Sequence, residues 1–362
     1  MSTRKQTAAR KRSPLSGKVQ TVLGPVEPSS LGPTLMHEHL LISLECYYVE
    51  PEEASERAYI NTPVQMGNRG LLRRRWWYVL DEMRLWDERT AIEEVLRFKH
   101  AGGGTVVDVT SIGISPDPLA LARISRATGL NVVMGGGWYV PLSHPPDMDK
   151  RTEDQLAERI IHDVTTGAGD TGIKCGIIGE LGNFYPLTAN ERKVLRAAAH
   201  AQAETGAPIT IHTGRGDQAS LDIIEALTKA GADPKHVAIG HLGPTMRDPK
   251  ALLALAQTGC FLQYDHFGCF EDTSSRYLGS TDGNISDVQR LEMLEFLITN
   301  GHVDQVLVSH DVCGNTHLVR YGGKGYAHLL DNIVPRMRKR GWTKAQTDAV
   351  TIHNPARALT FA

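Results

Sequence analysis

Residues 189–213, ANERKVLRAAAHAQAETGAPITIHT, contain the alternation that decides the fold. Ala189–Thr205 is a long alanine-rich stretch, and Gly206 after it is the residue type favoured just past the C-terminus of a helix. Pro208–Thr213 is a short run with β-branched residues, which is typical of a buried parallel strand. The stretch therefore predicts a helix that leads directly into a strand.

This alternation recurs along the whole chain. Short strand-like runs are predicted at Thr34–Ile42, Thr105–Thr110, Asn131–Met134, Gly176–Leu181, Pro208–Thr213, Val237–Leu242, Phe261–Tyr264 and Gln305–Val312. Helices are predicted between them at Asp87–Ala101, Leu119–Thr128, Glu153–Thr165, Ala189–Thr205, Ser220–Ala230, Pro249–Thr258 and Asp287–Asn300. Eight strands alternating with helices are the count for a TIM barrel, although a doubly wound sheet shares the alternation. A length of 362 residues fits two ordinary domains or one large barrel, and we predict an α/β protein with a (β/α)8 TIM barrel.

One connection is much longer than the others. It runs from Glu45 to about Asp87, so the barrel has a long loop insertion after strand 1. Loops of this length are usually functional lids or disordered, and in a barrel this one would lie on the catalytic face. Its basic-aromatic stretch, Arg73–Trp77, is either a solvated or packing feature or an anion site.

Composition excludes several classes of protein. Lys and Arg number 39 against 41 Asp and Glu, which gives a formal charge of -2 and argues against a nucleic-acid partner. No run of 18 apolar residues occurs and the mean hydropathy is -0.25, so we expect no membrane-spanning helix. Five cysteines without a CxxC pair argue against a disulfide framework. We expect a cytoplasmic protein that acts on a small-molecule substrate.

The N-terminal residues differ from the rest of the chain. Residues 1–18 contain six basic side chains and no acid, and no apolar segment follows, so we do not expect a cleaved secretory signal. We predict that residues 1–19 form a disordered basic tail, with a transit peptide or an electrostatic docking arm as alternatives. Residues 20–362 are predicted to form a single TIM-barrel domain.

Two histidines mark the end of the first predicted strand. In the sequence Leu35–Leu41, LMHEHLL, His37 and His39 are two residues apart. Alternate side chains of a strand point to the same side, so both imidazoles project together while Glu38 points away. Two such imidazoles form half of a metal site, although a His pair also occurs by chance.

Other polar residues stand at the C-terminal ends of further predicted strands. His212, His241 and Asp311 each follow an apolar run, and a buried imidazole needs a hydrogen bond or a metal. Each histidine alone could be a satisfied core residue, but together they lie where TIM-barrel active sites assemble. Glu180 ends the fourth strand, where a bridging position between two metal ions would neutralise it. Lys174, a rival bridge, starts that strand about 20 Å away and cannot reach the site.

The chain at this point resembles the phosphotriesterase family of the amidohydrolase superfamily, and within it the phosphotriesterase-related branch with a glutamate metal bridge. The matching stretches cover about residues 20–362 in order; they are LGPTLMHEHLL, IKCGIIGELG, ERKVLRAAAHAQAETGAPITIHTGRG, IGHLGPT, VLVSHDVC and LVRYGGKGYAHLLDNIVPRMRKRG. Phosphotriesterases and lactonases of the family use a carbamylated lysine at the position of Gly179. In this sequence the next residue, Glu180, is the one that matches the bridge of the related branch.

The resemblance implies a TIM barrel with two divalent metal ions, usually zinc and sometimes manganese, iron or cobalt. It places His37, His39 and Asp311 at the buried ion and His212 and His241 at the more exposed one. It also implies a homodimer. Known substrates across the family include organophosphate triesters, lactones and N-acyl amino compounds, so the resemblance indicates a reaction type better than a substrate.

Three functions follow from these residues. Two metal ions would lower the pKa of a shared water, and the bridging hydroxide is expected to attack an amide or N-acyl carbonyl. Asp311 would then shuttle the proton to the leaving group, which makes it the predicted catalytic residue. The alternatives are a lactonase, carboxylesterase or phosphotriesterase that uses the same centre, and a non-catalytic binding protein.

Substrate contacts are expected from the loops after the strands. The candidates are Trp138, Tyr139, Phe184, Arg215 and His266. Ordinary packing is an equal explanation for each aromatic residue. Arg215 directly follows a ligand strand, and a fixed guanidinium suits a substrate carboxylate, although a structural salt bridge is the alternative. An anion site at Arg215 would favour an N-acyl amino acid or another acidic amide.

Overall fold

Eight parallel strands form a barrel at the centre of the chain. The computed structural model describes residues 14–269 and 285–362. The strands are β3 Thr34–Glu38, β6 Thr105–Asp108, β7 Asn131–Gly136, β8 Ile177–Gly182, β9 Ile209–His212, β10 Val237–Ile239, β11 Phe261–Tyr264 and β12 Val306–Val308, hydrogen-bonded in this order. The last strand lies beside the first, because Asp311 N donates to His37 O at 3.1 Å. The predicted TIM barrel is therefore confirmed.

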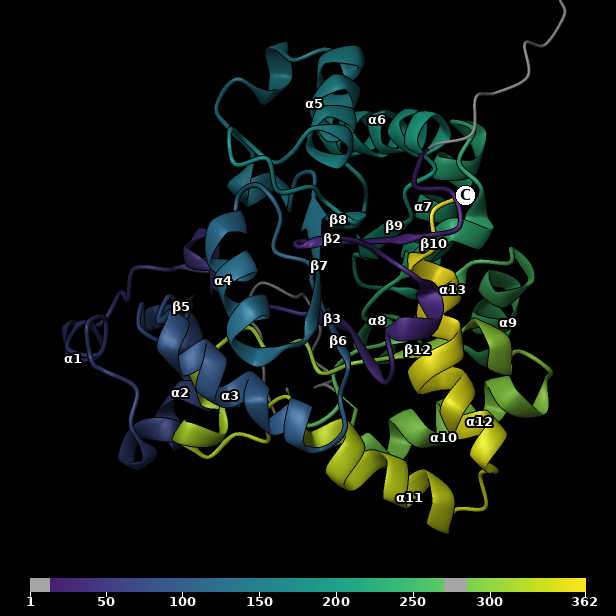
Figure 1. Ribbon diagram of the computed structural model, residues 1–362. Coiled ribbons are helices and arrows are strands. Elements are labelled where there is room, and N and C mark those ends of the chain that lie inside the picture. Colours follow the sequence, from purple (N-terminus) through teal and green to yellow (C-terminus); the bar gives the residue numbers. More distant parts are fainter. Residues whose placement is uncertain (1–13, 270–284) are drawn as a thin grey trace, which may run out of the picture.

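Helices surround the strands, as Figure 1 shows. They are α3 Glu88–His100, α4 Pro118–Thr128, α5 Glu153–Thr165, α6 Ala189–Thr205, α7 Asp217–Lys229, α8 Leu242–Thr245, α9 Pro249–Gln257 and α10 Asp287–Thr299. The predicted bounds of α5 and α6 are confirmed at both ends. Thr188 and Glu191 form a capping box at the start of α6, and Gly206 ends it with a left-handed φ of 74°. No helix among residues 14–269 and 285–362 is long and apolar enough to cross a membrane.

Both ends of the described chain pack beside the barrel. The hairpin of β1 (Val19–Thr21) and β2 (Gly24–Val26) lies at the amino ends of the strands, because Val22 N donates to Val132 O at 2.8 Å. Three more helices follow β12, at Val334–Lys339 (α11), Lys344–Asp348 (α12) and Asn354–Leu359 (α13). The sequence did not predict this hairpin. Because the hairpin covers the amino ends of the strands, their carboxyl ends form the open face. Residues 1–13 of the predicted tail lie outside the described residues.

The insertion after the first strand has structure of its own. A short antiparallel pair, β4 (Ile42–Ser43) and β5 (Arg84–Leu85), encloses α1 (Ala54–Arg57) and α2 (Arg69–Arg75). Trp77 from the basic-aromatic stretch is buried in the core, whereas Arg75 is exposed and pairs with Glu56. The described side chains of this stretch therefore pack the insertion against the barrel.

Three predicted strands end at least three residues earlier than expected. The predicted Thr34–Ile42, Val237–Leu242 and Gln305–Val312 correspond to β3, β10 and β12, which stop at Glu38, Ile239 and Val308. His241 and Asp311 both have a left-handed φ of 57°, and this conformation ends a strand. These two residues therefore stand just past the strands.

Glu82 attaches the insertion to the loop after β12. Its carboxylate accepts hydrogen bonds from Thr316 N at 2.9 Å and from Thr316 Oγ1 at 2.5 Å. Burial raises the pKa of Glu82 to about 7, although the two hydrogen bonds from Thr316 oppose the shift. Glu82 is therefore a buried carboxyl that ionises close to neutral pH.

The variant Glu82→Gln is expected to be more heat-stable than the wild type at pH 8. The folded pKa of about 7 lies above the unfolded value of about 4.3, so ionisation weakens folding at high pH. The cost of ionising Glu82 shrinks as the pH falls through 7 toward 5. The glutamine amide of the variant keeps both contacts with Thr316 and carries no charge. Thermal denaturation at pH 8 and pH 5 should show the larger gain in Tm at pH 8. An equal gain at both pH values would contradict the raised pKa.

Candidate metal centre

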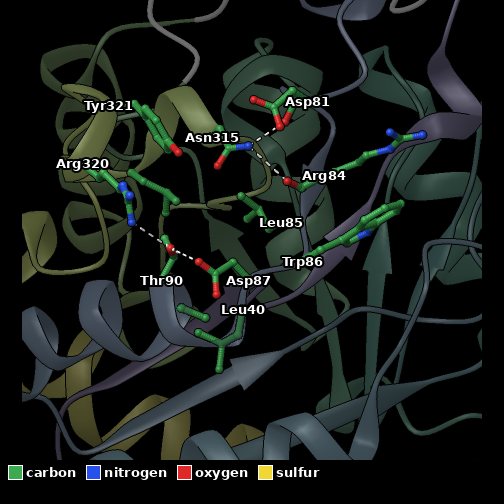
Figure 2. A pocket seen from close by; sticks show the side chains of 12 residues that line it. Leu40, Asp81, Arg84, Leu85, Trp86, Asp87, Thr90, Asn315, Arg320 and Tyr321 are labelled. Atoms are coloured by element: carbon green, nitrogen blue, oxygen red, sulfur yellow. Dashed lines mark hydrogen bonds between the residues drawn. The ribbon is translucent and has the colours of Figure 1, made fainter. Parts of the chain in front are cut away.

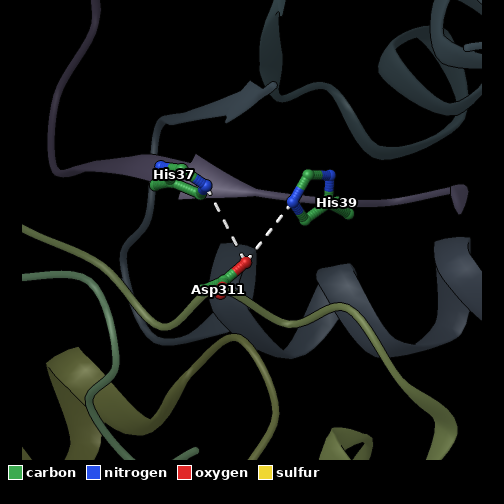
Figure 3. Close-up of side chains that lie close together, drawn as sticks. All are labelled: His37, His39 and Asp311. Atoms are coloured by element: carbon green, nitrogen blue, oxygen red, sulfur yellow. Dashed lines mark ion pairs between the residues drawn. The ribbon is translucent and has the colours of Figure 1, made fainter. Parts of the chain in front are cut away.

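Three side chains from the two neighbouring ends of the barrel sheet point toward one another in Figure 3. His37 and His39 project from the carboxyl end of β3, and Asp311 follows β12. Asp311 Oδ1 lies 3.3 Å from His39 Nε2 and 3.8 Å from His37 Nε2. The i and i+2 spacing of the two histidines thus places both imidazoles on the side of the strand that faces Asp311.

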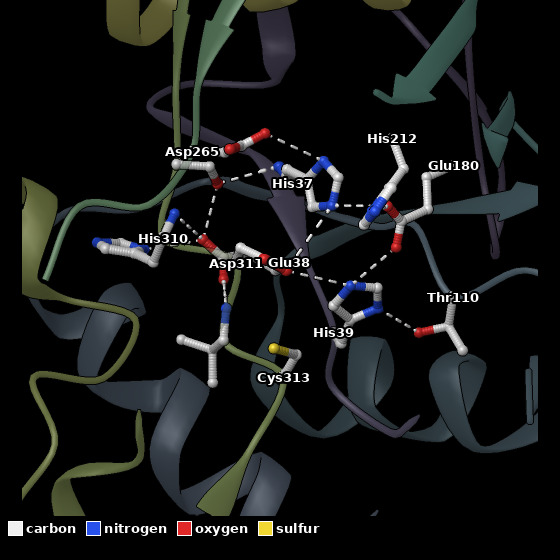
Figure 4. Close-up of polar contacts among 12 residues, drawn as sticks. His37, Glu38, His39, Thr110, Glu180, His212, Asp265, His310, Asp311 and Cys313 are labelled. Carbon is white, nitrogen blue, oxygen red and sulfur yellow. Dashed lines mark hydrogen bonds and ion pairs between the residues drawn. The ribbon is translucent and has the colours of Figure 1, made fainter. Parts of the chain in front are cut away.

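The carboxylate of Glu180 lies at the middle of four imidazoles. Glu180 Oε2 is 3.3 Å from His37 Nε2, 3.1 Å from His212 Nδ1 and 3.6 Å from His241 Nε2. Glu180 Oε1 is 3.2 Å from His39 Nε2. Five strand ends therefore contribute to one cluster, and all six predicted metal-ligating residues belong to it; Figure 4 shows most of them.

The cluster has the chemistry of a divalent metal site. The ligand atoms of His37, His39 and Asp311 lie within 4.8 Å of one another, and so do those of Glu180, His212 and His241. His37 Nε2 is fully buried and has no hydrogen-bond partner among the described residues. A buried nitrogen lone pair of this kind is costly unless a cation or a proton donor occupies it. The residues present therefore fit two metal ions that share Glu180.

Both carboxylates of the cluster are ionised at neutral pH. Burial by itself would raise the pKa of Glu180, but the nearby charge of His37 and the hydrogen bond from His212 hold that pKa well below its usual value. Burial opposes the shift of Asp311 too, and contacts from His266 and His39 still lower its pKa well below normal. Two buried negative charges beside four imidazoles attract cations.

The backbone at Gly179 excludes a lysine bridge. Gly179 has a φ of 115°, and a Cβ atom there would lie 2.1 Å from the carbonyl oxygen of Thr210. A longer side chain at this position would require the strand to move. Lys174 lies three residues before the start of β8, at the opposite end of the strand from Glu180. Of Lys174, Gly179 and Glu180, only Glu180 reaches the cluster.

Glu38 faces away from the cluster and holds the loop that carries Asp311. Its Oε1 accepts hydrogen bonds from Ser309 Oγ at 2.7 Å, His310 N at 2.9 Å and His310 Nδ1 at 2.8 Å. Its Oε2 accepts one from Val312 N at 3.0 Å. Glu38 thereby fixes His310 and Val312, the residues on both sides of Asp311.

Replacing Glu38 with alanine is expected to lower the free energy of unfolding by about 3 kcal/mol or more. The change leaves the buried N–H groups of His310 and Val312 without their acceptor. Urea denaturation of the metal-free protein measures the effect. The control Glu93→Ala removes an exposed glutamate from α3, where the loss should stay below about 1 kcal/mol. Equal losses in the two variants would show that Glu38 does not hold this loop.

Asp265 is a buried residue of the site that the sequence analysis missed. Its Oδ1 lies 2.9 Å from His241 Nδ1, and its Oδ2 lies 3.4 Å from His37 Nδ1. It thus contacts one histidine of each candidate metal group on the side away from Glu180. Burial alone would raise its pKa, but the charges of His241 and His37 hold the pKa of Asp265 far below normal. Its position directly after β11 was the available signal.

Two predicted substrate residues lie beside the cluster. The hydroxyl of Tyr139 is 3.3 Å from His212 Nδ1. The hydroxyl of Tyr47, in the insertion, donates a hydrogen bond to the Tyr139 hydroxyl at 3.3 Å. His266 Nε2 is 3.2 Å from Asp311 Oδ2. Sequence reasoning missed Tyr47 because nothing in its local sequence distinguishes it from a packing residue.

The other predicted substrate residues lie in the surrounding loops. Trp138 is 1% exposed and belongs to the hydrophobic core, so its indole packs inside the fold. Phe184 is half-buried in the loop after β8, and Arg215 is half-buried in the loop after β9. Trp138 is therefore placed for packing, whereas Phe184 and Arg215 are placed at the open face.

A separate cavity of about 290 Å³ lies between the insertion and the loop after β12, as Figure 2 shows. Asn315 from that loop donates to the backbone oxygens of Asp81 and Arg84 at 2.6 and 3.1 Å. Arg320 donates to Thr90 Oγ1 at 3.1 Å. None of the six clustered residues lines this cavity, and its polar groups are engaged in holding the insertion.

Comparisons with known proteins agree with this geometry. A model of the phosphotriesterase family matches residues 17–359. The N-acetyltaurine hydrolase of Homo sapiens is 43% identical over 350 residues, which are 96% of this chain and 99% of that protein. A solved resiniferatoxin-binding protein from Rhodobacter sphaeroides has a TM-score of 0.91 at 34% identity, covering 97% of this chain and 98% of its own. A lactonase from Listeria monocytogenes has a TM-score of 0.74 at 25% identity, covering 95% of this chain and 99% of its own.

Proposed function

Because the chain belongs to the phosphotriesterase family and is a metal-dependent hydrolase of amide or ester bonds, we propose that it cleaves the amide bond of a small N-acyl compound at a binuclear centre. The observation that carries the proposal is the position of Glu180, whose carboxylate contacts His37, His39, His212 and His241 together. A carboxylate in that position suits a bridge between two cations.

The six clustered residues divide into two sets of ligands. His37, His39 and Asp311 would hold one ion, and His212 and His241 would hold the other, with Glu180 between them. Imidazole and carboxylate ligands suit zinc, and also manganese, iron or cobalt. Two bound divalent ions supply an activated water and polarise the substrate carbonyl.

Side chains of the chain itself handle the proton and the substrate. Asp311 has one oxygen toward His37 and His39 and the other within 3.2 Å of His266 Nε2. Burial lowers the pKa of His266 to about 4, so this imidazole is neutral at pH 7. In this arrangement Asp311 Oδ2 accepts a proton and passes it to the leaving nitrogen. The Tyr139 hydroxyl is placed to donate a hydrogen bond to the substrate.

The relatives favour an amide over an ester. The N-acetyltaurine hydrolase relatives are 40–43% identical over 96% of the chain, whereas the lactonase of Listeria monocytogenes is 25% identical. A lactonase or other esterase remains the second candidate, because the barrels of such enzymes superpose on this one at a TM-score of 0.74.

A substrate panel tests the proposal. Protein reconstituted with zinc or manganese is assayed on N-acetyltaurine, an N-acetyl amino acid, an aryl amide, a lactone, a carboxylester and a phosphotriester. We expect release of amine from an amide, and loss of that release on treatment with a chelator. Turnover of the lactone or the triester without turnover of any amide would replace the proposal with the second candidate.

A further inference from the structure

Arg215 is a charged side chain without a charge partner. It is half-buried in the loop after β9, three residues beyond His212. Within residues 14–269 and 285–362 it makes no hydrogen bond or ion pair. Removing a guanidinium from water without pairing it is costly, and the fully buried Arg290 avoids that cost by pairing with Asp287 at 3.0 Å. The structural salt bridge that was the alternative explanation for Arg215 is thus absent from the described residues.

A second arginine lies next to the first. Gly216 N donates to Thr245 O at 3.1 Å, which joins the loop after β9 to the loop after β10. The carboxylate of Asp217 accepts hydrogen bonds from Arg247 N at 2.6 Å and from Asp248 N at 3.0 Å. The exposed Arg247 is thereby held close to Arg215. Burial first, and the charge of Arg247 second, lower the pKa of Arg215 to about 10, which leaves Arg215 charged at neutral pH.

Both arginines stand on loops that begin at the candidate metal centre. One loop starts after His212 and the other after His241. Three residues of extended chain span about 10 Å, so the backbone of Arg215 is within that distance of His212. A Cβ atom at Gly214 would lie 2.6 Å from the backbone of Phe184, so the loop is also packed against the loop after β8. The backbone of Arg215 is therefore held within one small-molecule length of His212.

We propose that Arg215 and Arg247 bind an anionic group on the amine side of the substrate, and that this group is a sulfonate in preference to a carboxylate. The inference rests on the proposed amide hydrolysis for its choice of substrates. A sulfonate presents three oxygens in a tetrahedral arrangement and can meet two guanidinium groups together, whereas a carboxylate presents two oxygens in one plane. An anion also relieves the repulsion between the two arginines.

The test compares three amides that differ only in the charged end. These are N-acetyltaurine, N-acetyl-β-alanine and N-acetylpropylamine, with a sulfonate, a carboxylate and no charge. The wild type should have the highest kcat/KM on the sulfonate. Arg215→Gln should raise KM for N-acetyltaurine by about 10- to 100-fold and change the neutral amide less than about twofold, since a hydrogen bond to a charged group contributes roughly 1.5–3 kcal/mol. The KM of Arg215→Lys for N-acetyltaurine should lie between the values of the wild type and Arg215→Gln.

A control and a binding measurement separate the possible failures. Arg126→Gln removes an exposed arginine from the last turn of α4, far along the chain from the two loops, and should leave all three substrates unaffected. Calorimetry with ethanesulfonate should show binding to the metal-loaded wild type and at least tenfold weaker binding to Arg215→Gln. Loss of amide turnover with ethanesulfonate binding intact would overturn the proposed function and keep the anion site. Equal effects of Arg215→Gln on charged and neutral amides would overturn the anion assignment, and a preference of the wild type for the carboxylate would overturn the choice of a sulfonate.

Discussion

Glu180→Ala is expected to reduce amide turnover by more than about 1,000-fold, which exceeds the cost of removing a single transition-state hydrogen-bond donor. The change removes a carboxylate that contacts four histidines, His37 and His39 of one candidate metal group and His212 and His241 of the other. Elemental analysis should find fewer metal ions per chain than in the wild type. Loss of activity and loss of metal are thus expected together.

The matched control for this variant is Glu82→Gln. Glu82 is also a buried glutamate, but it lies in the insertion, contacts Thr316 of the loop after β12 and is outside the cluster. This control should keep its metal content and its turnover. If Glu180→Ala retained two ions per chain and wild-type turnover, the bridging role of Glu180 would be wrong.

Asp311→Asn is expected to reduce turnover by roughly 100- to 10,000-fold, the usual contribution of a positioned acid or base. The amide keeps an oxygen near His39 but loses the charge and the proton-accepting oxygen that faces His266. Metal content should therefore fall only in part. This separation of activity from metal content distinguishes Asp311 from Glu180.

Steady-state kinetics and elemental analysis of the same protein samples measure both quantities. Circular dichroism confirms that the loop after β12 still folds, since Glu38 holds that loop through backbone contacts that the substitution leaves in place. Wild-type turnover in Asp311→Asn would end the proposal that Asp311 carries the proton.

The barrel and the cluster were predictable from the sequence because both depend on local patterns. Helices α5 and α6 begin with their own capping boxes, and α6 ends at a glycine, so their bounds are written in a few adjacent positions. A TIM barrel then brings the carboxyl ends of its strands to one face, and polar residues at those ends meet whatever their separation along the chain. His37 and Asp311 are 274 residues apart in sequence and meet in this way.

The residues that support the cluster were not predictable in the same way. Asp265 and Tyr47 act through partners on other elements, and no spacing in their own segments indicates these contacts. The early ends of β10 and β12 depend on the left-handed backbone of His241 and Asp311, which histidine and aspartate adopt only where the surrounding structure supports it. Sequence patterns locate the ligands, whereas tertiary contacts decide how each is held.

The tight fit around Gly179 has a consequence for how the centre is assembled. A carbamylated lysine is completed only after translation, by reaction with dissolved carbon dioxide, and this backbone has no space for such a side chain. A bridge supplied by Glu180 is complete as soon as the chain folds. A centre bridged in this way would depend on the supply of metal alone and would be independent of the bicarbonate concentration of its surroundings.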